Sequence, residues 1–283
     1  MLWGARMEIR NLLRMTVAVT ALAAGLLPAS IAVSEEKLKL THTVYMGGLY
    51  MGDVKTDIVQ TDDSYSIESK AQSSDTFKWL FSWVAEGQSR GLIDGNRFSP
   101  KAHIHQSAWN KKKRGAFIEY SPTGEVSFEI VGKPNANLKK YTPLDLKSIH
   151  KSYDPMTVIL ATSTRLQNGE ECVGSYPVFD GRRRYDIVLS EVGEKLFAPS
   201  EYSVFQGAAK GCKIKVNKMG GFNRSMAYDV TEARDLVLWT AAPTEGARIV
   251  PVRMQVETKF GAVEVHLANY SQGKVKLASK ISP

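Results

Sequence analysis

The sequence predicts a mostly β protein, in which a long antiparallel meander forms a strongly curved sheet or open barrel and two short helices cover its concave side. Three observations predict this fold. Apolar and polar residues alternate through most of the chain, turn-forming residues separate the alternating runs, and only two stretches show a helical period. Alternation puts successive side chains on opposite faces of a strand. One polar face per strand is typical of antiparallel sheets.

The alternating runs predict strands throughout the chain. In residues 37–44, for example, Leu38, Leu40 and Val44 share one face, while lysines and threonines share the other. Clusters of Gly, Asp, Asn, Ser and Pro predict the reversals between runs. The expected strands cover residues 37–44, 54–61, 65–71, 87–93, 101–109, 116–120, 125–130, 213–218, 252–257 and 263–267.

Two stretches favour helices. In residues 74–84, four apolar side chains follow the possible caps Ser74 and Asp75 at a spacing of i, i+3, i+4 and i+7, which gives a short apolar stripe. The second helix begins with Asp154 as N-cap and Pro155 at its first position. Asn168-Gly169 offers a left-handed end for it.

The beginning of the chain predicts a cleaved signal peptide at residues 1–32. A basic leader precedes an apolar run at residues 15–27, and Ser30 and Ala32 are small enough for a signal peptidase. The run is shorter than the roughly 20 apolar residues of a comfortable membrane span, although a retained anchor is the alternative. Residues 33–283 are then expected to form a single β-rich periplasmic domain.

Composition and compartment limit the partners. The chain has 283 residues, of which 43% are hydrophobic and 23% charged, as in globular proteins. Removal of residues 1–32 takes away three arginines and one glutamate and lowers the net charge from +8 to +6, and this positive excess suits peripheral contact with anionic envelope surfaces. Export makes nucleic acid an unexpected partner. No cofactor is expected, and the sequence predicts no oligomeric state.

The two cysteines, Cys172 and Cys212, are expected to form a structural disulfide. Two free thiols or partial ligation of a metal are the alternatives that the count leaves open. An oxidising compartment favours the bridge, and a redox-active pair is disfavoured because there is no C-x-x-C. On the chain-entropy model, closing this loop stabilises the fold by about 4 kcal/mol.

Two motifs have a possible chemistry. Residues 87–91 match the G-x-S-x-G nucleophile elbow around Ser89, but strand and turn residues follow where that motif needs a helix. A glycine-flanked strand is therefore favoured. His103 and His105 would share one face of a strand, yet a metal site needs a third and usually a fourth ligand. We expect no metal and no catalytic residues.

Two basic clusters remain. A solvated hairpin tip is predicted for the first, which comprises Lys111, Lys112, Lys113 and Arg114, and contact with anionic lipid or polysaccharide is the alternative. The second comprises Arg182, Arg183 and Arg184. In a strand at least one of these arginines must face the covered side and needs a carboxylate, for which Asp180 and Asp186 are close enough.

This second cluster also carries a resemblance. With Cys172 and the run Asp154-Pro155-Met156-Thr157 before it, the segment resembles a proteobacterial family of secreted proteins, domain of unknown function 3108. The residues that carry it are Phe179, Asp180, Gly181, Arg182, Arg183, Arg184, Tyr185 and Asp186. The resemblance implies an envelope protein without an assigned reaction, and it supplies no catalytic residues. The curved-sheet lipoprotein carriers of the periplasm are a fold-level analogy.

We therefore expect a non-enzymatic envelope protein that binds a lipid-like ligand or an envelope protein partner on the concave side of its sheet. The first alternative is a hydrolase acting on cell wall or lipid, with Ser89 or the histidine pair as the reactive groups. The second is a purely structural role in envelope maintenance.

Overall fold

The computed structural model describes residues 35–77, 82–110, 112–132, 140–224, 234–258 and 261–281. These residues belong to the second of the two units into which the chain divides, Val33–Pro283. The predicted signal peptide, residues 1–32, lies outside the described residues.

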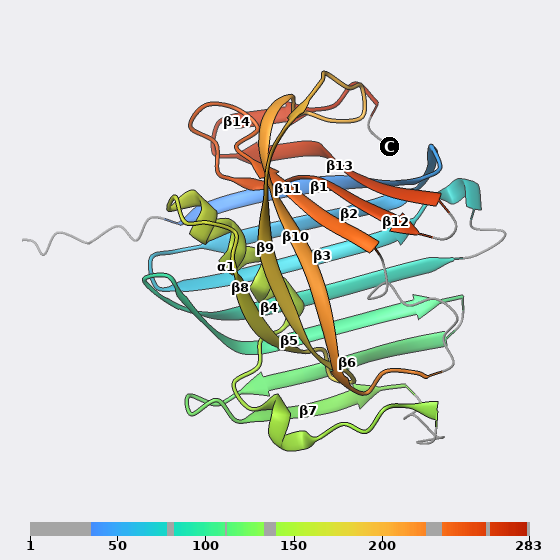
Figure 1. Ribbon diagram of the computed structural model, residues 1–283, viewed down its shortest axis with the longest axis vertical. Helices are drawn as coiled ribbons and strands as arrows, with labels where there is room; N and C mark the ends of the chain where they lie inside the picture. Colours follow the sequence, from blue (N-terminus) through green and yellow to red (C-terminus); the bar gives the residue numbers. More distant parts are fainter. Residues whose placement is uncertain are drawn as a thin grey trace, which may run out of the picture. The chain divides into compact units, whose positions relative to one another are not determined.

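The described residues form one 14-stranded antiparallel sheet (Figure 1). Its strands run in the order β7-β6-β5-β4-β3-β2-β1-β13-β12-β11-β10-β9-β8, and β14 also pairs with β13. The strands are β1 (Glu36–Met46), β2 (Leu49–Gln60), β3 (Ser64–Ser73), β4 (Trp83–Asp94), β5 (Arg97–Trp109), β6 (Lys112–Tyr120), β7 (Val126–Val131), β8 (Gly174–Phe179), β9 (Arg184–Phe197), β10 (Gly207–Gly220), β11 (Arg234–Ala241), β12 (Val250–Thr258), β13 (Gly261–Gln272) and β14 (Val275–Ala278).

The sheet curls but does not close, because β7 and β8 stand at its two ends and do not pair with each other. Strands β8 to β10 cross in front of β3 to β6, and helix α1 (Pro155–Gln167) lies on the side that they cover (Figure 1). The helix contacts β4 and β5 from one half of the sheet and β8 from the other. The predicted curved meander with helix on its concave side is therefore confirmed in outline.

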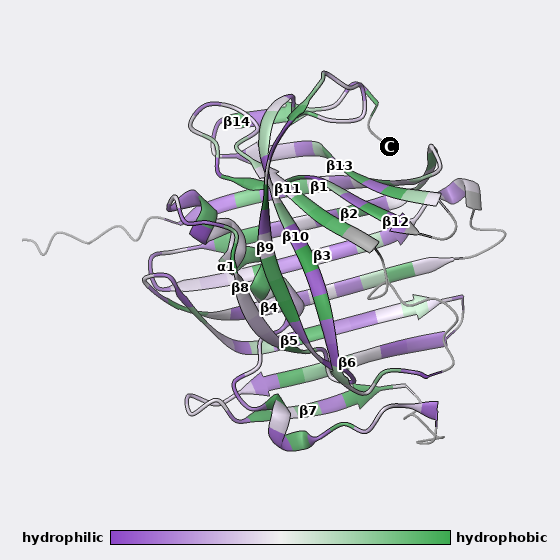
Figure 2. Cartoon of the chain, in the orientation of Figure 1, coloured by the Kyte–Doolittle hydropathy of each residue, from purple (hydrophilic) through white to green (hydrophobic). Residues whose placement is uncertain are grey.

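Alternation located the strands well. Every predicted strand is present, most of them longer than predicted, and Figure 2 shows apolar and polar residues alternating along them. Four strands were not predicted: β8, β9, β11 and β14. Strand β8 contains Pro177, and β11 reads as an almost continuous apolar run. Alternation in residues 125–130 puts Val126, Phe128 and Ile130 on the apolar face, yet Ile130 is 39% exposed because β7 is an edge strand.

Of the two predicted helices, only the second is found. Asp154 caps α1 by accepting hydrogen bonds from the backbone N–H groups of Met156 and Thr157, and Gly169 beyond its end has φ +81°. The prediction of a helix at 74–84 is wrong. A single 3-10 turn, η1 (Asp75–Phe77), follows β3, residues 78–81 lie outside the described ranges, and Val84 belongs to β4. Four apolar residues are too short a stripe to compete with the strand that follows.

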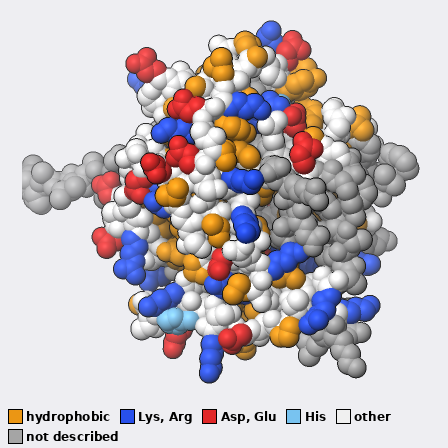
Figure 3. Space-filling model, in the orientation of Figure 1, with side chains coloured by type: hydrophobic (Ala, Val, Ile, Leu, Met, Phe, Trp, Pro, Cys, Tyr) orange, Lys and Arg blue, Asp and Glu red, His pale blue; other side chains and the backbone are white. Residues whose placement is uncertain are grey.

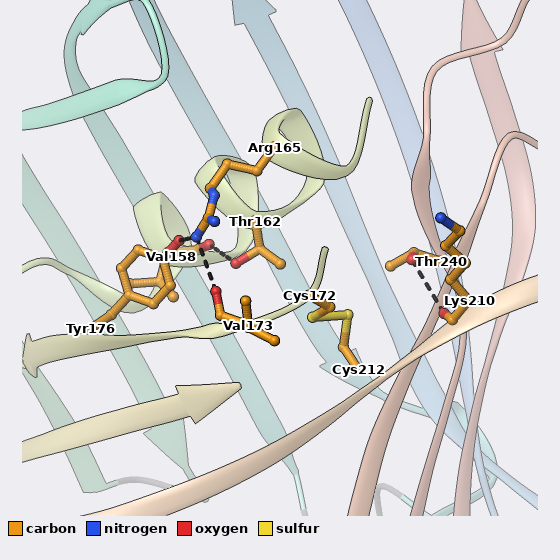
Figure 4. Close-up of a disulfide and its surroundings, with 9 residues drawn as sticks. All are labelled: Val158, Thr162, Arg165, Cys172, Val173, Tyr176, Lys210, Cys212 and Thr240. Carbon is orange, nitrogen blue, oxygen red and sulfur yellow. Dashed lines mark hydrogen bonds between the residues drawn. A yellow bond between two sulfur atoms is a disulfide. The ribbon is translucent and has the colours of Figure 1, made fainter. Parts of the chain in front are cut away.

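The predicted disulfide between Cys172 and Cys212 is confirmed. It joins the segment after α1 to β10 (Figure 4). Both cysteines are buried in a small apolar cluster with Leu166 and Leu189. Beside it, the guanidinium of Arg165 donates to the carbonyl of Val173 at 3.1 Å and to the hydroxyl of Tyr176 at 3.2 Å. The bridge and Arg165 hold the end of α1 against the C-terminal half of the sheet.

None of the helices in the described part of the chain has the length and hydrophobicity that crossing a membrane requires.

Candidate ligand-binding cavity

An apolar cavity of about 640 Å³ lies between α1 and the concave face of the sheet. Its walls come from two parts of the chain that are distant in sequence, β1 to the start of β4 and β11 to β13, and from one face of the helix. The apolar residues that line it are Leu38, Leu40, Val44, Val54, Ile58, Ile67, Trp83, Met156, Ile159, Leu160, Leu238, Ile249, Val250, Pro251, Met254, Val263 and Val265.

The alternation of side chains along the strands explains why the walls are apolar. In β1, Leu38, Leu40, His42 and Val44 point to the cavity, and directly opposed partners such as Ile58 on β2 and Val265 on β13 extend the apolar surface sideways. Small side chains leave the space open, because Ser69 on β3 and Ser163 on α1 stand where larger apolar residues would fill it.

Most polar groups of the wall are satisfied within the protein. The Nε2–H of His42 donates to the carbonyl of Pro251 at 2.9 Å, and burial lowers the pKa of this histidine, so that its ring is neutral. The hydroxyls of Thr56 and Ser69 lie 3.2 Å apart and bond to each other. A surface with apolar walls and satisfied polar groups is best suited to bind a hydrocarbon group.

One end of the cavity carries a charged side chain, Arg248, which is 6% exposed. Its Nη2 donates to the side-chain oxygen of Gln60 at 2.5 Å and to the hydroxyl of Thr164 on α1 at 2.9 Å. Its Nη1 lies 3.3 Å from a carboxylate oxygen of Glu36. Burial lowers the pKa of Arg248, while Glu36 opposes this shift.

Ser89 lies in the middle of β4, so the predicted glycine-flanked strand is confirmed and residues 87–91 form no nucleophile elbow. The structure nevertheless brings Ser89 together with His103, its cross-strand neighbour on β5, and with Asp154. The Ser89 hydroxyl donates to Asp154 Oδ1 at 2.6 Å and accepts from His103 Nδ1 at 2.8 Å. All three residues are buried.

This hydrogen-bond order differs from that of a serine hydrolase. There the histidine accepts the serine proton, and the carboxylate holds the other ring nitrogen. Here the serine proton points at the carboxylate, and the remaining ring nitrogen of His103 lies 3.2 Å from Nδ1 of His105. Burial lowers the pKa of His103 and lowers that of His105 to about 4, so both rings are neutral near pH 7.

The carboxylate of Asp154 is saturated with donors. Oδ1 accepts from the backbone N–H groups of Met156 and Thr157, at 3.0 and 2.9 Å, as well as from Ser89. Oδ2 accepts from the Thr157 hydroxyl at 2.5 Å, which in turn lies 2.8 Å from the hydroxyl of Tyr65 on β3. We call Tyr65, Ser89, His103, Asp154 and Thr157 the capping network. It ties the beginning of α1 to three strands.

His103 and His105 share a face as predicted, with ring centroids 5.3 Å apart. Within the described ranges, no cluster of three or more histidine, cysteine, aspartate or glutamate side chains is placed to hold a metal ion.

The segment Phe179–Asp186 is a tight, internally paired turn between β8 and β9. Asp180 accepts from the backbone N–H groups of Arg182 and Arg183 and pairs with the Arg183 guanidinium at 2.7 Å. Arg184 is 8% exposed and pairs with Asp186 at 2.6 Å, so the predicted ion pairs are confirmed. Gly181 has φ +84°, and an added Cβ would lie 2.2 Å from that of Ala116.

Two aromatic residues of this segment also pack into the fold, Phe179 fully buried and Tyr185 half-buried. Phe179 stacks edge-on against Phe128, with ring centroids 4.9 Å apart. Burial raises the pKa of Tyr185. The segment therefore fastens β8 and β9 to β6 and β7 rather than lining the cavity.

The first basic cluster is exposed. Lys112, Lys113 and Arg114 begin β6, and Lys111 lies outside the described residues. On the face shown in Figure 3, lysine and arginine side chains are scattered among acidic ones. Contact of this cluster with an anionic surface stays a prediction.

Sequence reasoning missed most of the cavity. The even-numbered residues of β1 were assigned correctly to one apolar face, but nothing in the sequence indicated that β11 to β13 complete the wall that they begin. Arg248 lies in a loop without a periodic pattern, and only its single charge among apolar neighbours at 247–252 could have drawn attention to it.

Comparison with known proteins adds a family and a fold. Residues 41–268 match the model of a family described as protein of unknown function, DUF3108. Among solved structures, the chain is similar to a β-barrel-like protein of domain of unknown function DUF1849 from Brucella abortus, with 11% identity and a TM-score of 0.50. The similarity covers 85% of this chain and 99% of that one. No curated protein matches the chain.

Proposed function

The chain belongs to the DUF3108 family, and we propose that it is a non-enzymatic protein that binds a lipid-like ligand between α1 and the concave face of its sheet. The observation that carries the proposal is the apolar cavity of about 640 Å³. Ligand sites of proteins measure roughly 300 to 1,000 Å³ and combine apolar walls with a few placed polar groups. The cavity meets both conditions.

Hydrophobic burial provides the affinity. Each Å² of apolar surface removed from water contributes about 25 cal/mol, and both the ligand tail and the cavity wall lose such surface on binding. Strands from both halves of the sheet hold the wall in place, so little ordering of the protein opposes binding.

The capping network favours this proposal over the hydrolase alternative. A nucleophilic serine needs a base to take its proton and space for a substrate beside it. Ser89 is 3% exposed, gives its hydrogen bond to Asp154 and is not among the residues that line the cavity. Its contacts are those of a side chain that helps to cap a helix.

We further propose that the mature protein acts in the periplasm after removal of residues 1–32. The disulfide supports this location, because such bridges persist in oxidising compartments. A lipid-like ligand would also be available there, beside the membranes of the envelope.

Native mass spectrometry of the protein purified from the cells that produce it tests the proposal. We expect a bound amphiphile, and we expect a lipid extract of those cells to raise the Tm of the delipidated protein. No bound mass together with an unchanged Tm would contradict the proposal.

A matched pair of variants locates the site. Ser69→Phe adds bulk to the cavity wall, whereas Ser66→Phe makes the same change on the exposed face of β3. We expect Ser69→Phe to abolish the Tm shift by lipid while both variants keep the circular dichroism of the parent. Equal binding by the two variants would exclude the cavity as the site.

A further inference from the structure

Arg248 distinguishes one end of the cavity from the rest. It is the charged residue of the lining whose side chain is most deeply buried, at 6% exposed, whereas the side chain of Arg253 is 21% exposed and pairs with Glu264 at 2.9 Å. A buried guanidinium needs an anionic or strongly accepting partner, because desolvation of an unpaired charge costs several kcal/mol.

The anionic partner of Arg248 is loosely held. Glu36 begins β1, its side chain is 37% exposed, and its oxygen lies 3.3 Å from Nη1, the longest of the three side-chain contacts that Arg248 makes. The other oxygen of Glu36 accepts from Gln272 at 2.6 Å. Rotation into water would break the hydrogen bond from Gln272, but the Glu36 side chain is already partly solvated, so water can replace that donor.

From this geometry we propose that the ligand is an anionic amphiphile with a small head group, such as a carboxylate, which pairs with Arg248 in place of Glu36 while the tail lies along the apolar wall. The inference rests on the proposed function and specifies its ligand class. Nη2 already donates to Gln60 and Thr164, so the head group would accept a charge-assisted hydrogen bond from Nη1. Such a bond between two charged groups is roughly twice as strong as one that a neutral head group accepts.

The same geometry disfavours a cationic head group. A cation at this end would compete for Glu36 and leave Arg248 buried without its counter-charge. A neutral head group would leave the pair of Arg248 and Glu36 in place and gain no charged hydrogen bond. The tail has room in each case, because β1 runs along the wall from Leu38 to Val44, a distance of about 20 Å at 3.3 Å per residue.

Three probes with the same tail test the proposal: dodecanoate, dodecanol and dodecylammonium, titrated below their micelle concentrations by isothermal calorimetry. We expect the delipidated protein to bind dodecanoate about tenfold more tightly than dodecanol, since one charge-assisted hydrogen bond accounts for about that ratio. Dodecylammonium should bind most weakly.

Two variants assign the preference to this end of the cavity. Arg248→Gln should lose the preference for dodecanoate yet keep its affinity for dodecanol, which shows that the cavity is intact. Glu36→Gln removes the competing carboxylate and should tighten dodecanoate several-fold. It also serves as the test if Arg248→Gln does not fold.

The outcomes separate the two proposals. If dodecanol and dodecanoate bind equally well and Glu36→Gln changes neither affinity, the inference about Arg248 is overturned and the apolar cavity stands. If none of the three probes binds, the proposed function itself fails.

Discussion

The beginning of helix α1 and the rest of its inner face differ in their surroundings, which are polar and buried at the beginning and apolar and hollow along the rest. At its beginning, the capping network pairs the carboxylate of Asp154 with four donors, and the network is buried. Along the rest of its inner face, Ile159, Leu160 and Ser163 face a hollow with apolar walls. The comparison teaches that residues resembling a catalytic motif serve structure here, whereas inconspicuous alternating residues build the candidate site.

Among the changes that test this comparison, removal of the Asp154 carboxylate should lower the stability of the fold most. In Asp154→Ala, the donors of Ser89, Thr157 and the first turn of α1 lose their acceptor in a buried place, so we expect the free energy of unfolding to fall by about 3–5 kcal/mol. Urea denaturation measures it. Asp145→Ala is the control, because Asp145 caps the short helix η3 (Leu146–Ile149) at an exposed position, and it should cost about 1 kcal/mol.

A loss below about 1 kcal/mol for Asp154→Ala would mean that the capping network does not anchor the helix.

Opening the disulfide should affect the other end of α1. The double variant Cys172→Ser, Cys212→Ser should lose up to about 4 kcal/mol, which is the chain-entropy value for its loop. Denaturation with and without reductant gives the same comparison in the parent protein. Carboxymethylation of the denatured parent should label neither cysteine until reductant is added, and labelling without reductant would contradict the bridge.

The variant Ser89→Ala distinguishes a structural role of Ser89 from a catalytic one. We expect a loss of about 1–3 kcal/mol in stability, because Asp154 loses one of its donors. Binding of dodecanol should be unchanged, since Ser89 is not among the lining residues. Loss of a cellular function with unchanged stability would instead favour the hydrolase alternative.

Acidification should weaken the region around the network. Burial lowers the pKa of His105 to about 4, whereas the unfolded chain keeps a value near 6.5. Between these values the unfolded state binds more protons, so stability is present above pH 6.5 and falls as the pH drops towards 4. The contribution of one such histidine is at most about 1.4 kcal/mol per pH unit.

The pKa values of His42, His103 and His266 are lowered as well, so these histidines add to the pH dependence of stability. The variant His105→Gln removes the contribution of His105 alone. Urea denaturation between pH 7.5 and 5 should give a smaller slope for the variant than for the parent. Identical slopes would show that His105 is not kept neutral by the fold.

The smallest effect should come from the exposed basic cluster. Replacing Lys112, Lys113 and Arg114 by alanine should change stability by less than about 0.5 kcal/mol. Co-sedimentation with vesicles rich in anionic lipid should decrease, because the binding free energy weakens by about 1 kcal/mol for each basic residue that contacts the surface. Unchanged sedimentation would leave the cluster without a role at membranes.

Local rules predicted much of the fold. The strands were predictable because one face of each is wet, and the N-cap Asp154 and the disulfide follow from residue chemistry. The partners of Asp154 were not predictable, because Ser89 and His103 reach it from strands that are 50 or more positions away in the chain. The helix at 74–84 failed because its stripe was short, and the cavity depends on how far the sheet curls, which alternation does not determine.

The position of β1 at the junction between the halves of the sheet has a consequence for how the chain matures. Its neighbours are β2, the next strand along the chain, and β13, which ends at Gln272. A chain that emerges N-terminus first therefore leaves one edge of β1 without backbone partners until β13 has been released. Pairing over such a separation is slow, and an open strand edge invites association with other chains. A chaperone that shields β1 should therefore raise the yield of folded protein more than one that acts on later strands.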